Sequence, residues 1–324
     1  MAQHTVLVVS DIHYACSAER ARECYETCHI SSRVLRTLLR LYRHFIWLRD
    51  PTGQNYLLRN FLEAVGTADD VVVANGDFSC DTAFVGVSDD AACRSAGECL
   101  AALARQFGNR LETVIGDHEL GKLSMFGGVG GLRLSSWMRA REELGLKAFW
   151  QRRVGNYRLI GVTSTLLAFP VYEPEALPAE RAQWYELREA HLREIREAFG
   201  SLGATERVIL FCHDPTALPF LWRDEPLRAS LAKIERTVIG HLHSPLLFWK
   251  SRLLAGMPPI TFLGNTARRL STALHQARLW RPFRVTLCPS LAGLELLKDG
   301  GYLRLRLDDE QPGQTIVERY RLQR

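Results

Sequence analysis

The sequence predicts an α/β protein in which short buried strands alternate with helices. The chain has 324 residues, of which 47% are hydrophobic and 24% charged, as in a globular protein with a large core. Its strand-like runs are short, apolar and rich in β-branched residues, which is typical of fully buried strands. No internal repeat or linker interrupts this pattern, so we expect residues 1–324 to form one domain.

The expected strands and helices alternate along the chain. In the first part they are a strand at residues 5–9, helices at 16–28, 31–50 and 55–65, a strand at 71–74, a helix at 89–107 and a strand at 111–115. In the second part they are a strand at 157–163, a helix at 178–199, strands at 207–211, 237–239 and 260–263, and an alternating pair at 302–307 and 315–322. We interpret the helical residues 15–53, which follow the first strand, as an insertion or lid.

Residues 31–50 have a distinctive amphipathic pattern. Large apolar residues occupy one half of the helical wheel and arginines the other, with no acidic partners three or four positions further on. An ordinary amphipathic helix would pack its apolar half on the core. A helix that meets anionic lipid headgroups, or covers an acyl chain, would show the same pattern, with Arg36, Arg40 and Arg43 as contacts.

Composition argues against several classes of protein. The net charge of +5 is too small to indicate a nucleic-acid or membrane partner by itself. The first apolar run is too short for a signal peptide, and no segment approaches the roughly 18 apolar residues of a membrane span. The eight cysteines form no Cys-x-x-Cys pair, so we expect reduced thiols in a cytoplasmic protein.

The glycine-rich segment 125–131 has the composition of a phosphate-binding loop. It lacks the Gly-Lys-Ser/Thr ending of a P-loop, however, and it does not follow an expected strand. We therefore interpret this segment as a flexible connection.

Aspartates and histidines stand just past the ends of five expected strands. They are Asp11 and His13, Asp77, Asp117, His213, and His241 with His243. Side chains beyond the C-terminal strand ends of an open α/β sheet converge on one crevice. A single histidine at a strand end is usually structural, but seven ligand-type residues at five strand ends indicate a metal site.

The residue types favour particular metals. Aspartates supply hard oxygen ligands and histidines supply imidazoles, a mixture suited to manganese, iron or zinc rather than to calcium or a thiolate site. Two such ions need a shared carboxylate; together they hold a phosphoryl oxygen and lower the pKa of a water between them to roughly 7. We therefore expect a metal-dependent enzyme that cleaves phosphoesters.

The motif series Asp-x-His, Gly-Asp, Gly-Asp-His-Glu, His and Gly-His-x-His, between residues 11 and 243, resembles that of the calcineurin-like metallophosphoesterase superfamily. The resemblance implies a four-layer α/β/β/α sandwich and two divalent metal ions, manganese first and iron or zinc as alternatives. The implied ligands are Asp11, His13 and His243 for one ion, Asp117, His213 and His241 for the other, and Asp77 as a bridge. His118 would face the substrate, stabilising charge on the phosphoryl oxygens or protonating the leaving group.

One position departs from the pattern of the superfamily, which usually has asparagine where this chain has Asp117. An aspartate can also coordinate through oxygen. Its extra negative charge would bind the metal more tightly while weakening the pull of the metal on the substrate.

The substrate is a separate question, because this fold hosts protein phosphatases, nucleases, cyclic-nucleotide esterases and pyrophosphatases. The basic helix at 31–50 and the Gly-Asp-His-Glu variant together resemble the enzymes, first recognised in chlamydiae, that hydrolyse UDP-2,3-diacylglucosamine in lipid A synthesis. This implies a lipid-linked substrate and a peripheral position on the inner face of the cytoplasmic membrane. A second basic stretch, at 268–284, would complete an acyl-binding or membrane-facing surface or simply cover the sheet.

Two alternatives remain open from the sequence. A nuclease or nucleotide phosphodiesterase would use the same arginines on a nucleic-acid backbone. The segment lacks the spaced aromatic residues that stack bases, however, so we do not expect nucleic acid as a partner. A metal-binding scaffold without catalysis is the non-enzymatic alternative. Such proteins usually lack ligands, whereas every expected ligand position here has a competent residue.

Overall fold

Two five-stranded sheets form the centre of the computed structural model, which describes residues 3–22, 27–66, 68–124, 128–262, 265–311 and 313–323. The first sheet has the spatial order β10 (Ile316–Arg321), β9 (Gly301–Asp308), β1 (Gln3–Val9), β2 (Val71–Asn75) and β3 (Leu111–Val114). The second has the order β4 (Phe149–Val154), β5 (Tyr157–Val162), β6 (Arg207–Cys212), β7 (Ile234–Ile239) and β8 (Val285–Leu287).

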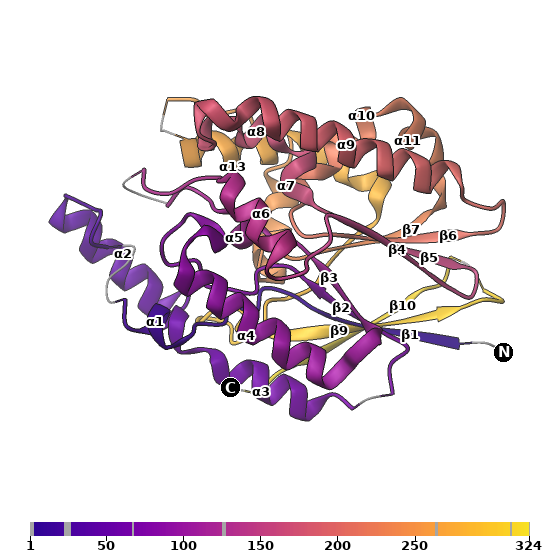
Figure 1. Ribbon diagram of the computed structural model, residues 1–324, viewed down its shortest axis with the longest axis horizontal. Helices are drawn as coiled ribbons and strands as arrows, with labels where there is room; N and C mark the ends of the chain where they lie inside the picture. The colour runs from indigo at the N-terminus through magenta and orange to yellow at the C-terminus, as the bar shows by residue number, and fades with distance from the viewer. Residues whose placement is uncertain are drawn as a thin grey trace.

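Helices cover both outer faces of the pair of sheets. In chain order they are α1 (Ser17–Arg20), α2 (Arg33–Phe45), α3 (Asn55–Ala64), α4 (Asp90–Phe107), α5 (Asp117–Leu120), α6 (Leu134–Glu142), α7 (Ser164–Leu167), α8 (Phe169–Tyr172), α9 (Arg181–Gly200), α10 (Leu218–Arg223), α11 (Glu225–Ser230), α12 (Pro245–Leu253) and α13 (Asn265–Gln276). Figure 1 shows α3 and α4 outside the first sheet and α9, α10 and α11 outside the second. The expected four-layer α/β/β/α sandwich is confirmed.

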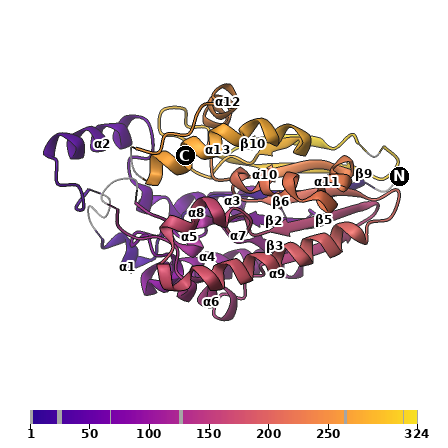
Figure 2. The ribbon, with the colours of Figure 1, turned by 90° about the horizontal axis from the view of Figure 1, so that it is seen from above.

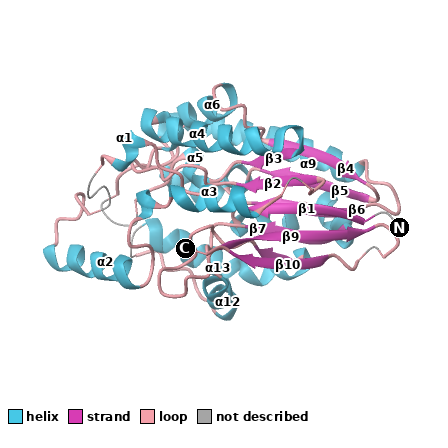
Figure 3. Ribbon diagram, turned by 90° about the horizontal axis from the view of Figure 1, so that it is seen from below, coloured by secondary structure: helices cyan, strands magenta, loops and turns pink. Residues whose placement is uncertain are grey.

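The strand directions bring several carboxyl ends to one end of the molecule. β1, β2 and β3 are mutually parallel, as are β5, β6, β7 and β8, while β9 and β4 pair in antiparallel fashion with β1 and β5. In Figure 3 the strands lie toward one end, and loops and short helices gather at the other. Loops that follow parallel strands therefore share that end.

Apolar and polar residues do not alternate along strands such as β1, because both faces of these strands are buried. In β1, Val6 and Val8 join a core between the two sheets, whereas Leu7 and Val9 belong to the core beneath the helices. Each of these four side chains is fully buried. A strand between two apolar layers has no solvent-facing positions, so its sequence is continuously apolar.

Most expected elements are confirmed, and the differences have local causes. β4 and β8 have no counterpart in the sequence prediction, because β4 carries charged residues and β8 is only three residues long. The strand expected at 260–263 is wrong over residues 260–262: two prolines precede it, and Phe262 is 84% exposed. The helix expected at 16–28 is reduced to α1, and residues 23–26 lie outside the described part.

The helix expected at 31–50 is α2, which ends at Phe45. The Ser32 side chain caps it by accepting a hydrogen bond from the Leu35 amide at 3.3 Å. In Figure 2, α2 stands at one end of the molecule, away from both sheets. Only Leu39 of this helix is buried, so its apolar half does not pack on the core.

None of the helices in the described ranges is both long enough and apolar enough to cross a membrane. The described cysteines are free thiols. Of the glycine-rich segment interpreted as a flexible connection, residues 125–127 lie outside the described part, and the amide of Ser124 donates to the Val129 carbonyl across them at 2.8 Å.

Candidate metal centre

The structure brings all seven ligand-type residues together at the carboxyl ends of five strands. Asp11 and His13 follow β1, Asp77 follows β2, Asp117 follows β3, His213 follows β6, and His241 and His243 follow β7. Their donor atoms form two groups, each within 4.8 Å: a first cluster of Asp11, His13 and His243, and a second cluster of Asp77, Asp117, His213 and His241. A third group of the same size limit joins His13 and Asp77 to His118. These clusters could hold two metal ions.

Asp77 lies between the two clusters. Its Oδ2 is 3.2 Å from Nε2 of His213 in the second cluster and 4.0 Å from Nε2 of His13 in the first. Within the first cluster, Nε2 of His13 and Nε2 of His243 are 3.3 Å apart. Imidazole nitrogens so close favour an ion or proton between them. The position of Asp77 suits a carboxylate shared by two ions.

Hydrogen bonds fix the orientation of three imidazole rings. Nδ1 of His213 lies 2.6 Å from the Asn75 carbonyl oxygen, and Nδ1 of His118 lies 2.9 Å from that of Cys80. Nδ1 of His13 is 3.4 Å from the Ser79 carbonyl oxygen. A carbonyl oxygen can only accept, so in the neutral rings each Nδ1 carries the proton and each Nε2 presents a lone pair to the centre.

Two buried atoms support a fit to metal. Among the described residues, Nε2 of His213 and Oδ2 of Asp117 make no hydrogen bond, although both are buried. Buried polar atoms are normally satisfied, and exceptions occur where an ion belongs. The mixed carboxylate and imidazole donor set also suits manganese, iron or zinc.

The backbone at the centre is unusual. Asp11, His13, Asp77, His241 and His243 all have φ between 50° and 62°. This left-handed region is uncommon for residues other than glycine and costs about 1–3 kcal/mol each. Five strained residues among the seven of the two clusters indicate that the loops are shaped by the site, not by local preference.

Two glycines of the motifs let the loops approach each other. A Cβ on Gly240 would lie 2.0 Å from Oγ of Ser10 and 2.6 Å from Oδ2 of Asp11. A Cβ on Gly116 would lie 2.2 Å from Oδ1 of Asp77. All three contacts are shorter than atoms permit, so only glycine leaves the aspartates in place.

Glu119 joins the loops after β2 and β3. Its carboxylate accepts hydrogen bonds from the amides of Gly116 at 2.9 Å, Asp77 at 3.0 Å and Phe78 at 2.8 Å. Burial, together with the nearby Asp77 carboxylate, raises the pKa of Glu119 to about 7. This residue belongs to the Gly-Asp-His-Glu motif, but the sequence alone does not distinguish its positioning role from metal binding.

In the absence of ions, protons balance the charge of the second cluster. Burial favours the neutral imidazole of His241, but the carboxylates of Asp214 and Asp117 prevail and raise its pKa to about 9. Burial likewise opposes the charge on Asp117, while Lys122 and His241 hold its pKa well below the usual range. The acidic donors therefore stay ionised and attract cations.

His118, expected to face the substrate, lies beside the two clusters and forms a third group of donor atoms with His13 and Asp77. Its ring centroid is 4.5 Å from that of His13, and its Nε2 is 3.8 Å from Oδ2 of Asp77. Burial, and then the charge of Lys122, lower the pKa of His118 to about 3, so the ring is neutral at neutral pH. The Lys122 ammonium contacts its Nε2.

Lys122 and Asp214 are polar residues at the centre that the sequence does not reveal. Nζ of Lys122 is 3.4 Å from Oδ2 of Asp117, and Oδ2 of Asp214 is 3.8 Å from Nε2 of His241. Asp214 follows His213 in the chain, which is the only sequence signal for it. No sequence signal points to Lys122, because it lies in a loop after a four-residue helix.

The three arginines expected to contact lipid lie on α2, outside the two clusters. Arg40 is exposed, whereas Arg36 and Arg43 are half-buried. The Arg36 guanidinium donates to the Ile30 carbonyl at 3.0 Å. Trp47, just beyond the helix, connects this segment to the centre, because its ring centroid is 4.9 Å from that of His243.

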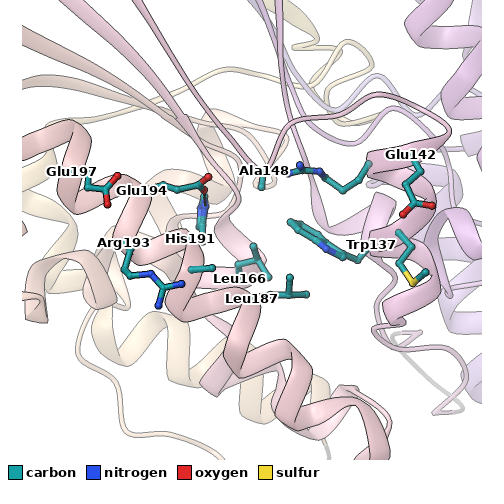
Figure 4. A pocket seen from close by; sticks show the side chains of 12 residues that line it. Trp137, Glu142, Ala148, Leu166, Leu187, His191, Arg193, Glu194 and Glu197 are labelled. Carbon is teal, nitrogen blue, oxygen red and sulfur yellow. Dashed lines mark ion pairs between the residues drawn. The ribbon is translucent and has the colours of Figure 1, made fainter.

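A cavity of about 610 Å³ lies elsewhere, between α6 and α9. Figure 4 shows Trp137 facing His191 and Leu187 across it. His191 has a structural role, since its Nε2 accepts a hydrogen bond from the Thr163 amide at 3.1 Å and burial lowers its pKa. None of the expected metal ligands lines this cavity.

Comparisons with known proteins find distant similarity to solved structures. No protein-family model and no curated protein matches the chain. A dimetal phosphatase from Danio rerio is 14% identical over 98% of this chain and 95% of its own, with a TM-score of 0.48. A phosphopantetheinyl hydrolase from Mycobacterium tuberculosis is 14% identical over 75% and 84%, with a TM-score of 0.32. A predicted phosphoesterase from Streptococcus pneumoniae is 10% identical over 99% of both chains, with a TM-score of 0.30.

Proposed function

We propose that this protein is a dinuclear-metal phosphohydrolase that cleaves a phosphodiester or pyrophosphate bond. The observation that carries the proposal is the pair of ligand clusters, in which Asp77 of the second cluster also faces His13 of the first, with His118 beside them. The two ions, manganese first and iron or zinc as alternatives, would be held by Asp11, His13 and His243 and by Asp117, His213 and His241. When bound, they would supply positive charge for the phosphoryl oxygens and acidify water.

The residues around the ions have distinct tasks in this proposal. Asp77 would hold the two ions at a fixed separation, because it lies between the clusters. His118 would act through Nε2, since its Nδ1 is fixed by the Cys80 carbonyl at 2.9 Å. From that position the ring would reach a phosphoryl oxygen or the leaving oxygen, and the proton that either role needs at Nε2 would come from the Lys122 ammonium that contacts it.

Lys122 accounts for the aspartate that replaces the usual asparagine. The ammonium lies 3.4 Å from the Asp117 carboxylate, so the extra negative charge has a matched positive charge beside it. The net charge of the centre is thereby restored. The pull of the metals on the substrate then need not be weakened, in contrast to the effect expected for an unmatched aspartate.

We further propose a lipid-linked nucleotide substrate, such as UDP-2,3-diacylglucosamine, met at a membrane surface. The support is the α2 apolar surface, formed by Val34, Leu38, Leu41, Phe45 and Ile46. Val34, Leu38 and Phe45 are 70%, 57% and 58% exposed. A contiguous exposed apolar helix face indicates a binding surface, and exposed Arg40 on the same helix suits anionic headgroups.

The position of α2 links that surface to the chemistry. The amide of Glu295 donates to the Trp47 carbonyl at 2.7 Å, which anchors the segment after α2. The Trp47 ring in turn stands against His243 of the first cluster. An acyl chain lying on α2 would therefore place its headgroup close to the metal centre.

The decisive experiment compares two substrates on the manganese-loaded protein. Turnover of UDP-2,3-diacylglucosamine should exceed turnover of the same nucleotide sugar without acyl chains, with formation of UMP or a lipid phosphate as the readout. Wild-type protein that hydrolyses no phosphoester would establish the scaffold alternative. DNA cleavage faster than cleavage of small diesters would favour the nuclease.

A second experiment separates the acyl surface from the metal centre. The variant L38S/F45S should bind anionic vesicles more weakly and lose the preference for the acylated substrate, while hydrolysis of a small diester stays unchanged. The variant R36Q/R40Q/R43Q should weaken binding to anionic but not to neutral vesicles. Unchanged vesicle binding and lipid turnover in both variants would refute the membrane proposal.

A further inference from the structure

A ring of contacts begins at Asp117 and ends at His241, two residues of the second cluster. Its first half runs through Lys122, whose ammonium contacts Asp117, and through Leu123, whose amide donates to Oε2 of Glu175 at 3.1 Å. The same carboxylate accepts two hydrogen bonds from Nη1 of Arg269, at 2.9 and 3.1 Å. Loop and helix residues distant in sequence thus meet beside the metal centre.

The second half of the ring returns to the metal ligands. The Arg269 guanidinium lies over the Tyr172 ring, 5.6 Å from its centroid, and the Tyr172 hydroxyl donates to Asp214. Asp214 is 3.8 Å from His241, which completes the circuit. Arg269 therefore lies toward the centre, not on an outer basic surface as one reading of the 268–284 stretch suggested.

Arg269 is held in place with part of its guanidinium still available to a ligand. Only its Nη1 is engaged with Glu175; among the described residues its Nε and Nη2 make no hydrogen bond. Its side chain is only 17% exposed. A guanidinium that is fixed at one nitrogen and free at two others presents a fork for two oxygens of a phosphate.

We propose that Arg269, with Lys122, forms a subsite for a second phosphoryl group beside the one at the metals, so that the centre selects phosphoanhydrides over single-phosphate esters. The inference rests on the proposed function and specifies its substrate class. The metals would hold the phosphoryl group that is attacked, and the Arg269 fork would hold its neighbour. Both cations are already matched by carboxylates, Lys122 by Asp117 and Arg269 by Glu175, which fixes their positions before a ligand arrives.

The test measures binding as well as turnover, on full-length metal-loaded protein. Inorganic pyrophosphate and inorganic phosphate are the probes for binding by calorimetry. In R269Q the Kd for pyrophosphate should rise about ten- to a hundredfold, as expected for lost hydrogen bonds to a charged group, while the Kd for phosphate changes less than about threefold. R268Q removes the neighbouring positive charge and is the matched control, with no selective change expected.

The conservative variant R269K separates the fork from charge alone. It keeps a cation that can pair with Glu175 but cannot offer two parallel donors, so its loss of pyrophosphate affinity should be intermediate. In turnover, R269Q should lower kcat/KM for a nucleoside diphosphate sugar at least tenfold more than for bis-p-nitrophenyl phosphate. If R269Q does not fold, the ratio of the Kd values of R269K for pyrophosphate and phosphate tests the subsite instead.

The outcomes are distinguishable. Equal losses for pyrophosphate and phosphate in R269Q, or the same selective loss in R268Q, would overturn the subsite. A wild-type protein that binds pyrophosphate more tightly than phosphate, through Arg269, yet hydrolyses nothing, would refute the proposed function while supporting the subsite.

Discussion

Replacing Asp117 by asparagine tests most directly whether the Lys122 ammonium compensates the charge of the Asp117 carboxylate. The carboxylate lies 3.4 Å from Nζ of Lys122. At an effective dielectric constant near 20, two unit charges at this distance attract by about 5 kcal/mol. The Lys122 side chain is 22% exposed, which reduces the interaction, so we expect about 3 kcal/mol, or about a hundredfold in an equilibrium constant.

The expected consequence is a lower metal affinity in D117N, with a coupling between positions 117 and 122 of about a hundredfold. The variant loses a charged ligand and also leaves the Lys122 ammonium without its partner beside the ions. The double variant D117N/K122M removes that repulsion and should recover at least tenfold in affinity. K122M alone should bind metal at least as tightly as wild type, because no neighbouring cation then offsets the Asp117 charge.

The assay is competition with a fluorescent chelator for Mn²⁺ and Zn²⁺ at constant ionic strength, with thermal melts as a folding control. Because the interaction belongs to the pair, the effect of K122M on metal affinity should differ between the wild-type and D117N backgrounds. If K122M has the same effect in both, or if D117N binds metal as tightly as wild type, Lys122 does not compensate Asp117.

Three further predictions concern the same centre. Burial of His241 is outweighed by neighbouring carboxylates, which raise its pKa to about 9. Because a ligand imidazole must be neutral, metal affinity should rise from pH 7 toward pH 9. Calorimetry in buffers of different ionisation enthalpy should detect proton release on metal binding at pH 7, and binding without proton release would contradict the ligand role of His241. H118A should reduce kcat by about 10²–10⁴-fold with metal content unchanged; loss of metal along with activity would make His118 a ligand instead. G240A, whose Cβ would lie 2.6 Å from Oδ2 of Asp11, should lower the bound metal from two ions to one, as measured by elemental analysis, and two tightly bound ions would refute the packing argument.

The convergence of the seven expected ligand residues could be predicted from the sequence, because all of them stand just past the ends of strands. Each motif follows an apolar run, and parallel strands deliver their ends to one edge. The structure places these residues in two clusters with Asp77 between them. Lys122 and Arg269 could not be found in this way, because their chemistry depends on neighbours distant in sequence, Asp117 and Glu175.

The orientation of α2 also lay beyond sequence reasoning. A helical wheel identifies an apolar half but not whether that half meets protein or solvent. The structure leaves Leu38 and Phe45 exposed although Leu39 is buried, and it leaves Arg36 half-buried although Arg40 is exposed. The two arrangements have the same sequence periodicity, so the pattern alone does not separate them.

The left-handed backbone limits how this centre can change its metal preference. Aspartate, asparagine and histidine tolerate positive φ better than other residues. A cysteine or glutamate in place of a positive-φ ligand residue would therefore strain the backbone; these residues are Asp11, His13, Asp77, His241 and His243. Asp117 and His213 have no such constraint. Ligand exchange, in evolution or in design, should therefore begin at these two positions, both in the second cluster.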